Sequence, residues 1–362
     1  MQLRYPTVCG KDVHPYAEMV STCMQVLCRF GEYLRKMRMN RKLRLMEGTV
    51  LGGSNNFFEI ECDDSVLRVC SLKSKRLKDT DGFYNPLAPG DRVSLEIDEI
   101  DSAKGQVLSL VPRRNKFVRW NVKKRLPQVM ASNLDCLLIV TTPDEPPFRP
   151  RFIDRALAQA EAEGIEGVIV CNKADLEAFS DIDLQSRLEI WEDIGYKVFC
   201  VSAHTGEGIK ELAEYIAGKT SALVGQSGIG KSSIVNALDG SKDLRTSSLS
   251  QKYGRGTHTT TKGTLMRLDL SAHLGKDAFA RVIDTPGVRR FVLHDITSEN
   301  LALYFREFKP LLGQCTFGMS CTHKTERGCK IQEAVYSGVI SEERYESWLR
   351  ICDEIDSGSW ED

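Results

Sequence analysis

A glycine-rich segment that ends in lysine and serine has the chemistry to hold phosphate groups. Residues 225–232 fit the pattern G-x-x-x-x-G-K-S, between an apolar run at 221–224 and a helix-compatible run at 233–238. This is the strand–loop–helix context that the pattern needs. Glycines let the backbone wrap around phosphate oxygens, and the N–H groups of the following helix supply positive potential. An unrelated glycine-rich turn is the alternative. The pattern predicts phosphate contacts from nine residues: Gly225, Gln226, Ser227, Gly228, Ile229, Gly230, Lys231, Ser232 and Ser233.

Two side chains of this loop and one later acid suit a magnesium-assisted phosphate reaction. Lys231 would reach the β- and γ-phosphates of a nucleotide and act in catalysis, and the Ser232 hydroxyl would hold Mg²⁺. Further along the chain, an apolar run ends in Asp284-Thr-Pro-Gly287. Asp284 is placed to act on Mg²⁺, and the N–H of Gly287 to sense a γ-phosphate. Alone, this segment would be an ordinary turn.

Two further segments predict recognition of a guanine base. The apolar run 167–171 ends in four residues with base-binding chemistry: Asn172, Lys173, Ala174 and Asp175. The Asp175 carboxylate can accept hydrogen bonds from N1–H and N2–H of guanine, which adenine does not offer. A third run, 196–201, is followed by Ser202 and Ala203, and the backbone of Ala203 would meet guanine O6. Because ligands of open α/β sheets bind at the carboxyl ends of the strands, the segments together predict a GTP site.

The order of these segments is itself informative, because the guanine segment precedes the phosphate loop. The order Asn-Lys-x-Asp, Ser-Ala, phosphate loop, His-Thr-Thr, Asp-Thr-Pro-Gly resembles that of the circularly permuted GTPases. Most closely it resembles the RsgA (YjeQ) family of small-ribosomal-subunit biogenesis GTPases, from roughly residue 46 to residue 355. The resemblance implies a multidomain α/β fold with four parts: a basic N-terminal extension (1–45), an OB-fold RNA-binding β-barrel (46–112), a circularly permuted P-loop GTPase domain (113–290) and a helical zinc-binding domain (291–362).

The twelve cysteines do not suggest a disulfide framework. Most are scattered, several of them in apolar runs, as in reduced cores of intracellular proteins. Four potential metal ligands cluster as C-x₅-C-x-H-x₅-C: Cys315, Cys321, His323 and Cys329. Three thiolates and one imidazole suit a closed tetrahedral zinc site that fastens a domain too small to bury a core by itself. The family pattern has four residues between the first two cysteines, whereas this chain has five. A redox or merely local cysteine cluster is the alternative.

The segment before the nucleotide motifs predicts a small β-barrel. Five short apolar runs separated by turn signals lie between residues 47 and 112, at 48–52, 57–61, 66–70, 91–97 and 105–110. Five strands of this length suit an OB-fold, which commonly offers a face and loops to nucleic acid. A small barrel without a ligand is the alternative.

The net charge of −1 conceals an asymmetry. Residues 1–125 contain 23 Lys and Arg against 15 Asp and Glu, while the remainder has 26 against 35. Two dense basic runs, 35–44 and 113–125, flank the predicted barrel, and the second carries Phe117 and Trp120 as candidate stacking groups. The runs therefore favour an RNA partner, bound through phosphate neutralisation. A solvated basic face is the alternative.

The attacking water needs an orienting group, which familiar GTPases supply as a glutamine just after the second acidic motif. Here that position is Val288, which has no hydrogen-bonding group. The predicted first switch, 254–261, offers His258 instead, in a Gly-x-His-Thr-Thr-like segment similar to that of the family. We expect His258 to position water once the ribosome orders the loop, and Thr259 or, by preference, Thr260 to complete Mg²⁺ coordination. A loop histidine that packs or contacts RNA is the alternative.

The resemblance implies GTP hydrolysis by an assembly factor for the small (30S) ribosomal subunit. Such a factor would bind rRNA, respond to the subunit with faster turnover, and leave after hydrolysis. An RNA- and zinc-binding ribosome chaperone with nucleotide as a mainly structural ligand is the alternative, because Val288 replaces glutamine. A permuted GTPase of the large subunit is disfavoured by the barrel and the cysteine cluster. Without an apolar run of about eighteen residues or a signal peptide, we expect a cytoplasmic protein. We expect a monomer, with neither membrane nor DNA partners.

Overall fold

The computed structural model describes residues 45–54, 56–74, 77, 80, 82–240, 263–287 and 291–360. The predictions for His258, Thr260, Val288 and residues 1–44 lie outside the described residues. Among the described residues, no helix is long and apolar enough to cross a membrane.

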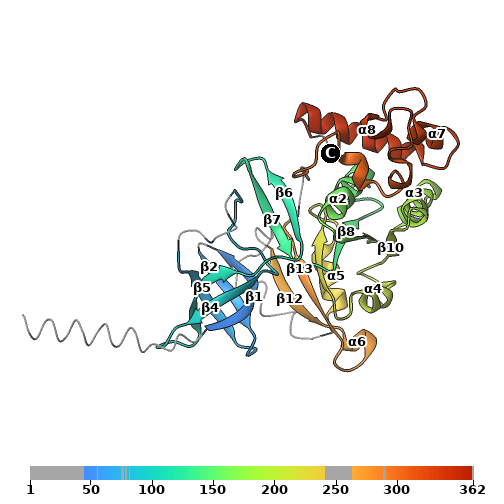
Figure 1. Cartoon of the computed structure of the whole chain (residues 1–362). Helices are drawn as coiled ribbons and strands as arrows, with labels where there is room; N and C mark the ends of the chain where they lie inside the picture. Colours follow the sequence, from blue (N-terminus) through green and yellow to red (C-terminus); the bar gives the residue numbers. More distant parts are fainter. Residues whose placement is uncertain are drawn as a thin grey trace, which may run out of the picture. The chain divides into compact units, whose positions relative to one another are not determined.

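Five short strands close into a barrel, as predicted (Figure 1). They are β1 (Leu45–Ser54), β2 (Phe57–Cys62), β3 (Leu67–Leu72), β4 (Arg92–Ile97) and β5 (Lys104–Leu110), in the closed order β1-β2-β3-β5-β4. Buried and accessible residues alternate along β2 and β4, because successive side chains of a strand point to opposite faces. Ile60, Val93 and Leu95 are among the inward residues that form the barrel core.

A mixed sheet of six strands follows the barrel in sequence. Its strands are β8 (Cys136–Thr141), β9 (Glu166–Cys171), β10 (Lys197–Cys200), β11 (Thr220–Val224), β12 (Thr264–Asp269) and β13 (Phe279–Asp284). Their order is β10-β9-β8-β11-β13-β12, and only the pairing of β12 with β13 is antiparallel. Every residue of β8 is buried, as expected for a parallel strand covered on both faces.

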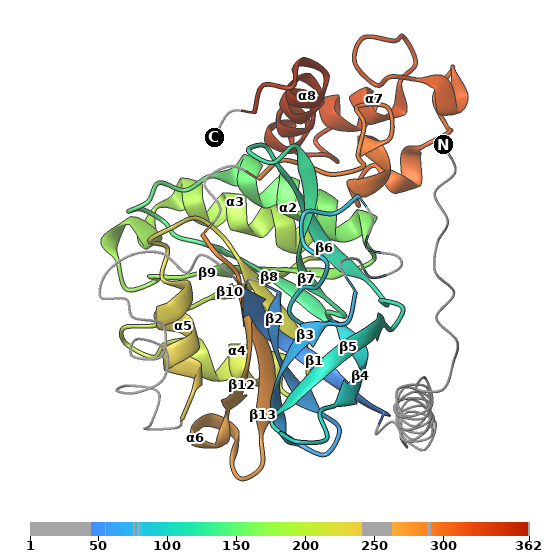
Figure 2. The same cartoon turned by 90° about the vertical axis from the view of Figure 1, so that its left-hand side faces the viewer.

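Helices cover both faces of this sheet (Figure 2). The helices of this region are α2 (Pro150–Ala162), α3 (Ile182–Asp193), α4 (Ile209–Ile216), α5 (Lys231–Leu238), α6 (Ser271–Leu274) and the 3₁₀ helix η1 (Glu177–Ser180). Leu137 and Ile139 of β8 share a core with α2 and α3. The alternate residues Leu138 and Val140 share a second core with α4 and α5. The region is therefore a doubly wound α/β fold.

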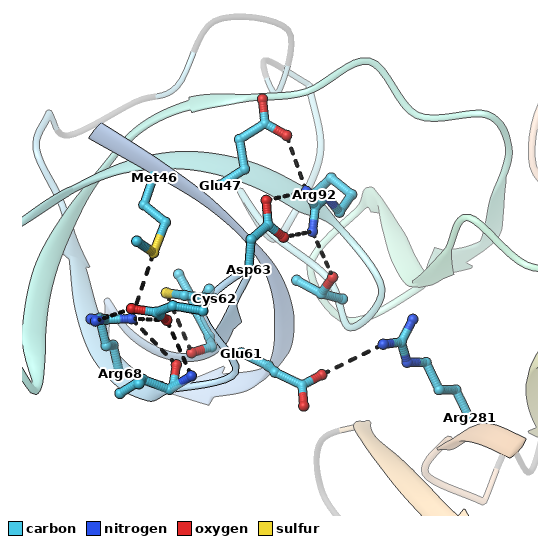
Figure 3. A network of polar contacts seen from close by, with 12 residues as sticks. Met46, Glu47, Glu61, Cys62, Asp63, Arg68, Arg92 and Arg281 are labelled. Carbon is cyan, nitrogen blue, oxygen red and sulfur yellow. Dashed lines mark hydrogen bonds and ion pairs between the residues drawn. The ribbon is translucent and has the colours of Figure 1, made fainter. Parts of the chain in front are cut away.

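A buried carboxylate joins the barrel to the residues that lie between its last strand and the sheet. Asp91, at the start of β4, is fully buried and accepts two hydrogen bonds from Arg113, at 2.7 and 2.8 Å. It also accepts from the Ser132 hydroxyl at 2.6 Å and from the N–H of Ala88 at 2.8 Å. A second, partly exposed ion pair joins Glu61 of β2 to Arg281 of β13 at 3.8 Å (Figure 3).

A hairpin of β6 (Lys116–Asn121) and β7 (Leu126–Ser132) follows the barrel. Phe117 is completely buried and stacks on Phe291 with ring centroids 5.3 Å apart. The prediction that Phe117 is a stacking group for RNA is therefore wrong, because its ring belongs to the core. Trp120 remains partly exposed.

The C-terminal region contains α7 (Lys330–Tyr336), α8 (Glu342–Ser357) and the 3₁₀ helices η3 (Leu301–Tyr304), η4 (Lys309–Leu311) and η5 (Gly318–Ser320). The residue patterns of 301–308 and 342–351 each predict a helix beside the cysteine cluster. The helix at 342–351 is confirmed as part of α8. The helix at 301–308 is wrong, since only a single 3₁₀ turn forms and Phe305 is extended. Burial decides the local structure here over helix propensity: Phe305 and Phe308 pack against each other, and Phe308 packs against Trp348 of α8.

The C-terminal region shares one continuous core with α2. A buried polar cluster adds to this contact. Asp154 of α2 accepts hydrogen bonds from Arg344, from the Ser347 hydroxyl at 2.5 Å and from Trp191 Nε1 at 2.9 Å. Arg344 also donates to Glu307 at 2.8 Å. The predicted division at residues 290/291 stays a prediction, and the hydrophobic core does not end there.

Candidate active site and metal centre

The four nucleotide segments lie at one edge of the sheet. They follow the carboxyl ends of β9, β10, β11 and β13, which are parallel to one another. Asn172 joins the segments directly: its Nδ2 donates to the carbonyl of Ile229 at 2.9 Å, and its Oδ1 accepts from the N–H of Ala203 at 3.2 Å. The structure therefore brings the predicted base and phosphate segments together.

The phosphate loop needs its glycines for space and for backbone conformation. Gly230 has φ +89°, and a Cβ on it would lie 2.3 Å from Asn172 Nδ2. A Cβ on Gly225 would lie 2.2 Å from Ile229 Cδ1 and 2.6 Å from the carbonyl oxygen of Val140. Such distances exclude a side chain at either position without a shift of the neighbours. Helix α5 begins at Lys231, directly after the loop, which confirms the predicted strand–loop–helix context.

Two buried charges face the phosphate loop. The ammonium of Lys231 donates to the carbonyls of Gly225 and Gln226 at 2.9 and 2.8 Å, and burial lowers its pKa. Asp284 is buried as well, and burial raises the pKa of its carboxyl group. Among the described residues, its Oδ1 has no hydrogen-bond partner. A buried carboxylate oxygen without a partner suits a magnesium ligand, and the hydroxyl-bearing Ser232 at the start of α5 is exposed.

Gly287 packs against the phosphate loop. A Cβ built on Gly287 would lie 3.0 Å from Ser227 Cα and 3.1 Å from Ser227 N. The segment that follows Asp284 is therefore in contact with the loop whose ligand it is predicted to sense.

The guanine-recognition residues are pre-arranged around an exposed carboxylate. Ser202 is fully buried, and its hydroxyl donates to Asp175 at 2.5 Å. This hydrogen bond lowers the pKa of Asp175, so the carboxylate stays ionised at neutral pH. The same hydroxyl accepts from the N–H of Thr205 at 3.0 Å. Ser202 thus orients Asp175, while the N–H of Ala203 is donated to Asn172 rather than left free for a base.

Sequence reasoning missed one support of this pocket. Lys173 adopts a left-handed conformation, and its ammonium donates to the backbone carbonyl of Glu145. Glu145 lies after β8, in a segment that is also held by the Thr142 hydroxyl, which donates to Pro146 O at 2.8 Å. The available signal was a Pro-rich, acidic turn directly after the apolar run 136–140, since ligands of such sheets bind at the carboxyl ends of strands.

The four predicted metal ligands converge in a buried cluster. Their ligand atoms all lie within 4.8 Å of one another. The Nδ1 of His323 is 3.5 Å from the sulfurs of Cys315 and Cys329, which are 3.9 Å apart. Bonds to zinc of about 2.3 Å from sulfur and 2.0 Å from nitrogen give tetrahedral edges of roughly 3.8 Å and 3.5 Å. The cluster therefore fits one zinc ion.

The surroundings of this cluster fix its shape. His323 has φ +60°, and its carbonyl accepts from Tyr345 Oη at 2.7 Å. The Glu326 carboxylate accepts from the N–H groups of Thr322, Lys324 and Thr325 at 2.8 to 3.1 Å. The five residues between Cys315 and Cys321 include the short helix η5. The extra residue is therefore accommodated while both cysteines remain in the cluster.

The basic run at 113–125 divides into two parts. Arg113 and Arg114 form ion pairs with Asp91 and Asp135, both at 2.7 Å. Within β6, Lys116 lies over the ring of Phe83 and Arg119 donates to Gln128 at 3.3 Å. The turn between β6 and β7, which we call the hairpin tip, is exposed and carries the other three cations: Lys123, Lys124 and Arg125. The counted charge of the run therefore overstates what is available to a partner.

Comparisons with known proteins agree with this geometry. The family model of the RsgA GTPase matches residues 110–294. The small ribosomal subunit biogenesis GTPase RsgA of Chlorobaculum tepidum is 37% identical over 317 residues, which cover 86% of this chain and 98% of that protein. The crystal structure of YjeQ from Thermotoga maritima has 30% identity and a TM-score of 0.65, covering 86% of this chain and 98% of YjeQ. YloQ, a circularly permuted GTPase, has the same fold at 21% identity, with a TM-score of 0.63 over 88% of this chain and 98% of YloQ. The chain is therefore a circularly permuted GTPase of the RsgA family.

Proposed function

We propose that this GTPase is a cytoplasmic assembly factor of the small ribosomal subunit, acting as a monomer. The observation that carries the proposal is the single sheet edge at which four motif segments meet, in a chain that covers 98% of a small ribosomal subunit biogenesis GTPase. In this role the subunit stimulates GTP hydrolysis, and hydrolysis triggers release of the factor from the subunit.

The site residues divide the work of binding between base and phosphates. Asp175, oriented by Ser202, selects guanine, and the phosphate loop with Lys231 holds the triphosphate. Ser232, Asp284 and Thr260 supply oxygen ligands for Mg²⁺. When bound, this ion neutralises charge that develops on the phosphate oxygens. Because burial raises the pKa of Asp284, its carboxylate is most easily ionised when a cation is present.

Water activation needs a residue other than position 288. The side chain of Val288 has no hydrogen-bonding group, so His258 positions the attacking water when the subunit is bound. His258→Ala should abolish stimulation by the subunit and leave GTP affinity unchanged. Undiminished stimulated hydrolysis in this variant would remove His258 from the mechanism.

Strand β6 of the hairpin contacts the segment that begins at Phe291. The N–H of Trp120 in β6 donates to the carbonyl of Val292 at 3.0 Å, and Phe117 stacks on Phe291. The exposed cations of the hairpin tip contact rRNA phosphates. Through the contact of β6 with the segment that begins at Phe291, RNA binding at the tip and the bound nucleotide, GTP or GDP, influence each other. Zinc fastens the C-terminal region that begins with the same segment.

The test measures the GTPase rate with and without purified small subunits, and subunit affinity in the GTP- and GDP-bound forms. We expect faster hydrolysis with subunits and tighter binding in the GTP form. Equal affinity of both forms would exclude release by hydrolysis. Slow hydrolysis that subunits do not change, with intact binding, would favour the RNA- and zinc-binding chaperone for which Val288 is the supporting observation.

A further inference from the structure

The barrel itself is acidic, although the sequence on both sides of it is basic. Residues 46–112 contain twelve Asp and Glu against seven Lys and Arg. Residues 1–45 and 113–125 together contain sixteen Lys and Arg against three Asp and Glu. The positive excess of the first 125 residues therefore lies in the flanks. Since nucleic acids are bound chiefly by neutralising phosphates, the charge of the barrel opposes RNA.

The cations that the structure describes in the barrel are already paired with its own acids. Figure 3 shows two of them, Arg68 and Arg92. The pairs are Arg68 with Asp64 at 2.7 Å, Lys73 with Glu96 at 2.9 Å, Arg92 with Asp63 at 2.8 Å and with Glu47 at 3.1 Å, and Lys104 with Asp101 at 2.9 Å. A phosphate would have to displace a carboxylate at each of these four side chains.

The outer face of β2 and β3 combines apolar and acidic side chains. Phe57, Leu67 and Val69 are 59%, 46% and 44% exposed. Leu67 pairs with Glu61, and Val69 pairs with Glu59, so the two kinds of side chain alternate across the strands. The loop before β5, whose Ala103 carbonyl accepts from the N–H of Val69 at 2.9 Å, contains another exposed apolar residue, Ile100. We call the surface on the two strands the acidic–apolar face; it consists of Phe57, Glu59, Glu61, Leu67 and Val69.

We propose that the acidic–apolar face docks a lysine- or arginine-rich segment of a small-subunit protein that carries apolar side chains among its cations. Clustered exposed apolar residues mark interaction sites. The acidic balance of the barrel and the Glu59 carboxylate on this face favour a cationic partner over rRNA, while Glu61 is already paired with Arg281. A second copy of this chain is a poor occupant, because a symmetric contact would place identical acidic surfaces against each other. The proposal rests on the proposed function. It assigns the two components of the subunit to two surfaces: the hairpin tip binds rRNA, and the barrel binds protein.

The test compares two probes, intact purified small subunits and protein-free small-subunit rRNA. One full-length variant, Phe57→Thr with Val69→Thr, removes apolar surface but keeps residues that suit strands. A second, Glu59→Lys, reverses charge on the same face. We expect each variant to bind intact subunits about tenfold more weakly and protein-free rRNA as well as the wild type does.

Two control variants give the comparison its direction. Ile182→Thr makes the same kind of change at a 79% exposed residue of α3 and should alter neither affinity. Lys124→Glu in the hairpin tip should weaken binding to both probes. Thermal midpoints of all variants, measured alongside, confirm that the barrel remains folded.

Three results would overturn the docking surface. An equal loss of affinity for both probes would make the face an RNA site. Unchanged affinity for intact subunits would mean that the face is unused or covered by another part of the chain. Self-association of the wild type that the variants abolish would assign the face to a second copy. If the wild type bound neither probe, the proposed function itself would fail, which the wild-type measurement alone reveals.

Discussion

The nucleotide edge of the sheet and the surface of the barrel owe their properties to different features of the chain. At the edge, backbone N–H groups and a few side chains at fixed offsets from strand ends do the work. On the barrel, the kind of partner depends on the exposed side chains that are not paired with other charged residues of the chain. The first kind of property follows from local spacing. The second depends on pairings between distant residues, such as Arg92 with Glu47. Nucleotide binding and hydrolysis at the edge should therefore change strongly with single substitutions. In the barrel and in the basic run 113–125, the effect of a substitution should depend on whether the residue is paired with another charged side chain.

The largest effect is expected at the nucleotide edge, from Asp175→Asn. Because the carboxylate is exposed and accepts a hydrogen bond from the Ser202 hydroxyl, the variant should keep its fold but lose both hydrogen bonds to guanine. GTP hydrolysis measured as kcat/KM should fall by about three to four orders of magnitude. Xanthosine triphosphate, which offers a carbonyl where guanine has an amino group, should become the better substrate. A variant that keeps its GTP preference would show that Asp175 does not contact the base.

The next largest effect concerns Arg113, which belongs to a basic run but not to a basic surface. Its guanidinium is bidentate to the buried Asp91, so Arg113→Met leaves a carboxylate without its cation. We expect a loss of about 3 to 5 kcal/mol in the free energy of unfolding, measured by denaturant titration. The double variant with Asp91→Asn should recover much of the loss, because both charges are then removed. A single variant as stable as the wild type would contradict the buried junction.

The sequence predicted most of the fold, and the structure brings together the predicted motif segments at the sheet edge and the four residues of the cysteine–histidine cluster. The five barrel strands and the strand–loop–helix around Lys231 formed where their patterns predicted. What the sequence could not reveal were partners made by folding. Phe117 stacks on Phe291, Glu145 receives the ammonium of Lys173, and Asp154 meets Arg344. Each joins residues far apart in the chain, so no local spacing encodes it, and a count of charges over a segment mixes buried pairs with free cations.

The metal centre shows the same contrast on a smaller scale. Its four ligands are recognisable from their spacing in the sequence, whereas the residue that holds their loop, Glu326, is not. The Glu326 carboxylate accepts hydrogen bonds from three backbone N–H groups of its loop. The hydrogen bond from the Thr322 hydroxyl, together with those from the backbone, lowers the pKa of Glu326 to about 2. Glu326→Ala should weaken zinc affinity roughly tenfold, measured by competition with a chelator, whereas the exposed Glu333→Ala is the matched control. Unchanged zinc affinity in Glu326→Ala would mean that the metal ligands fix the shape of this loop without help from Glu326.

The pH dependence of zinc binding should come from the thiols rather than from Glu326. A pKa of about 2 keeps this carboxylate ionised from roughly pH 5 to pH 8. Burial raises the pKa of Cys321 to about 12 in the metal-free protein, so zinc must displace a proton there. Affinity should therefore fall as pH is lowered, equally in the wild type and in Glu326→Ala. A steeper fall in the variant would contradict this assignment.

The smallest effect is expected from Lys124→Met in the hairpin tip, and it is the counterpart of Arg113→Met. Lys124 is exposed and has no ion pair among the described residues, so its loss should leave the free energy of unfolding unchanged. A phosphate contact releases about one counterion, and the slope of log affinity for rRNA against log salt should shrink by about one. Arg113→Met should leave that slope as it is. If both substitutions changed the slope equally, the run would act as one surface, and the distinction between buried and available charge would fail.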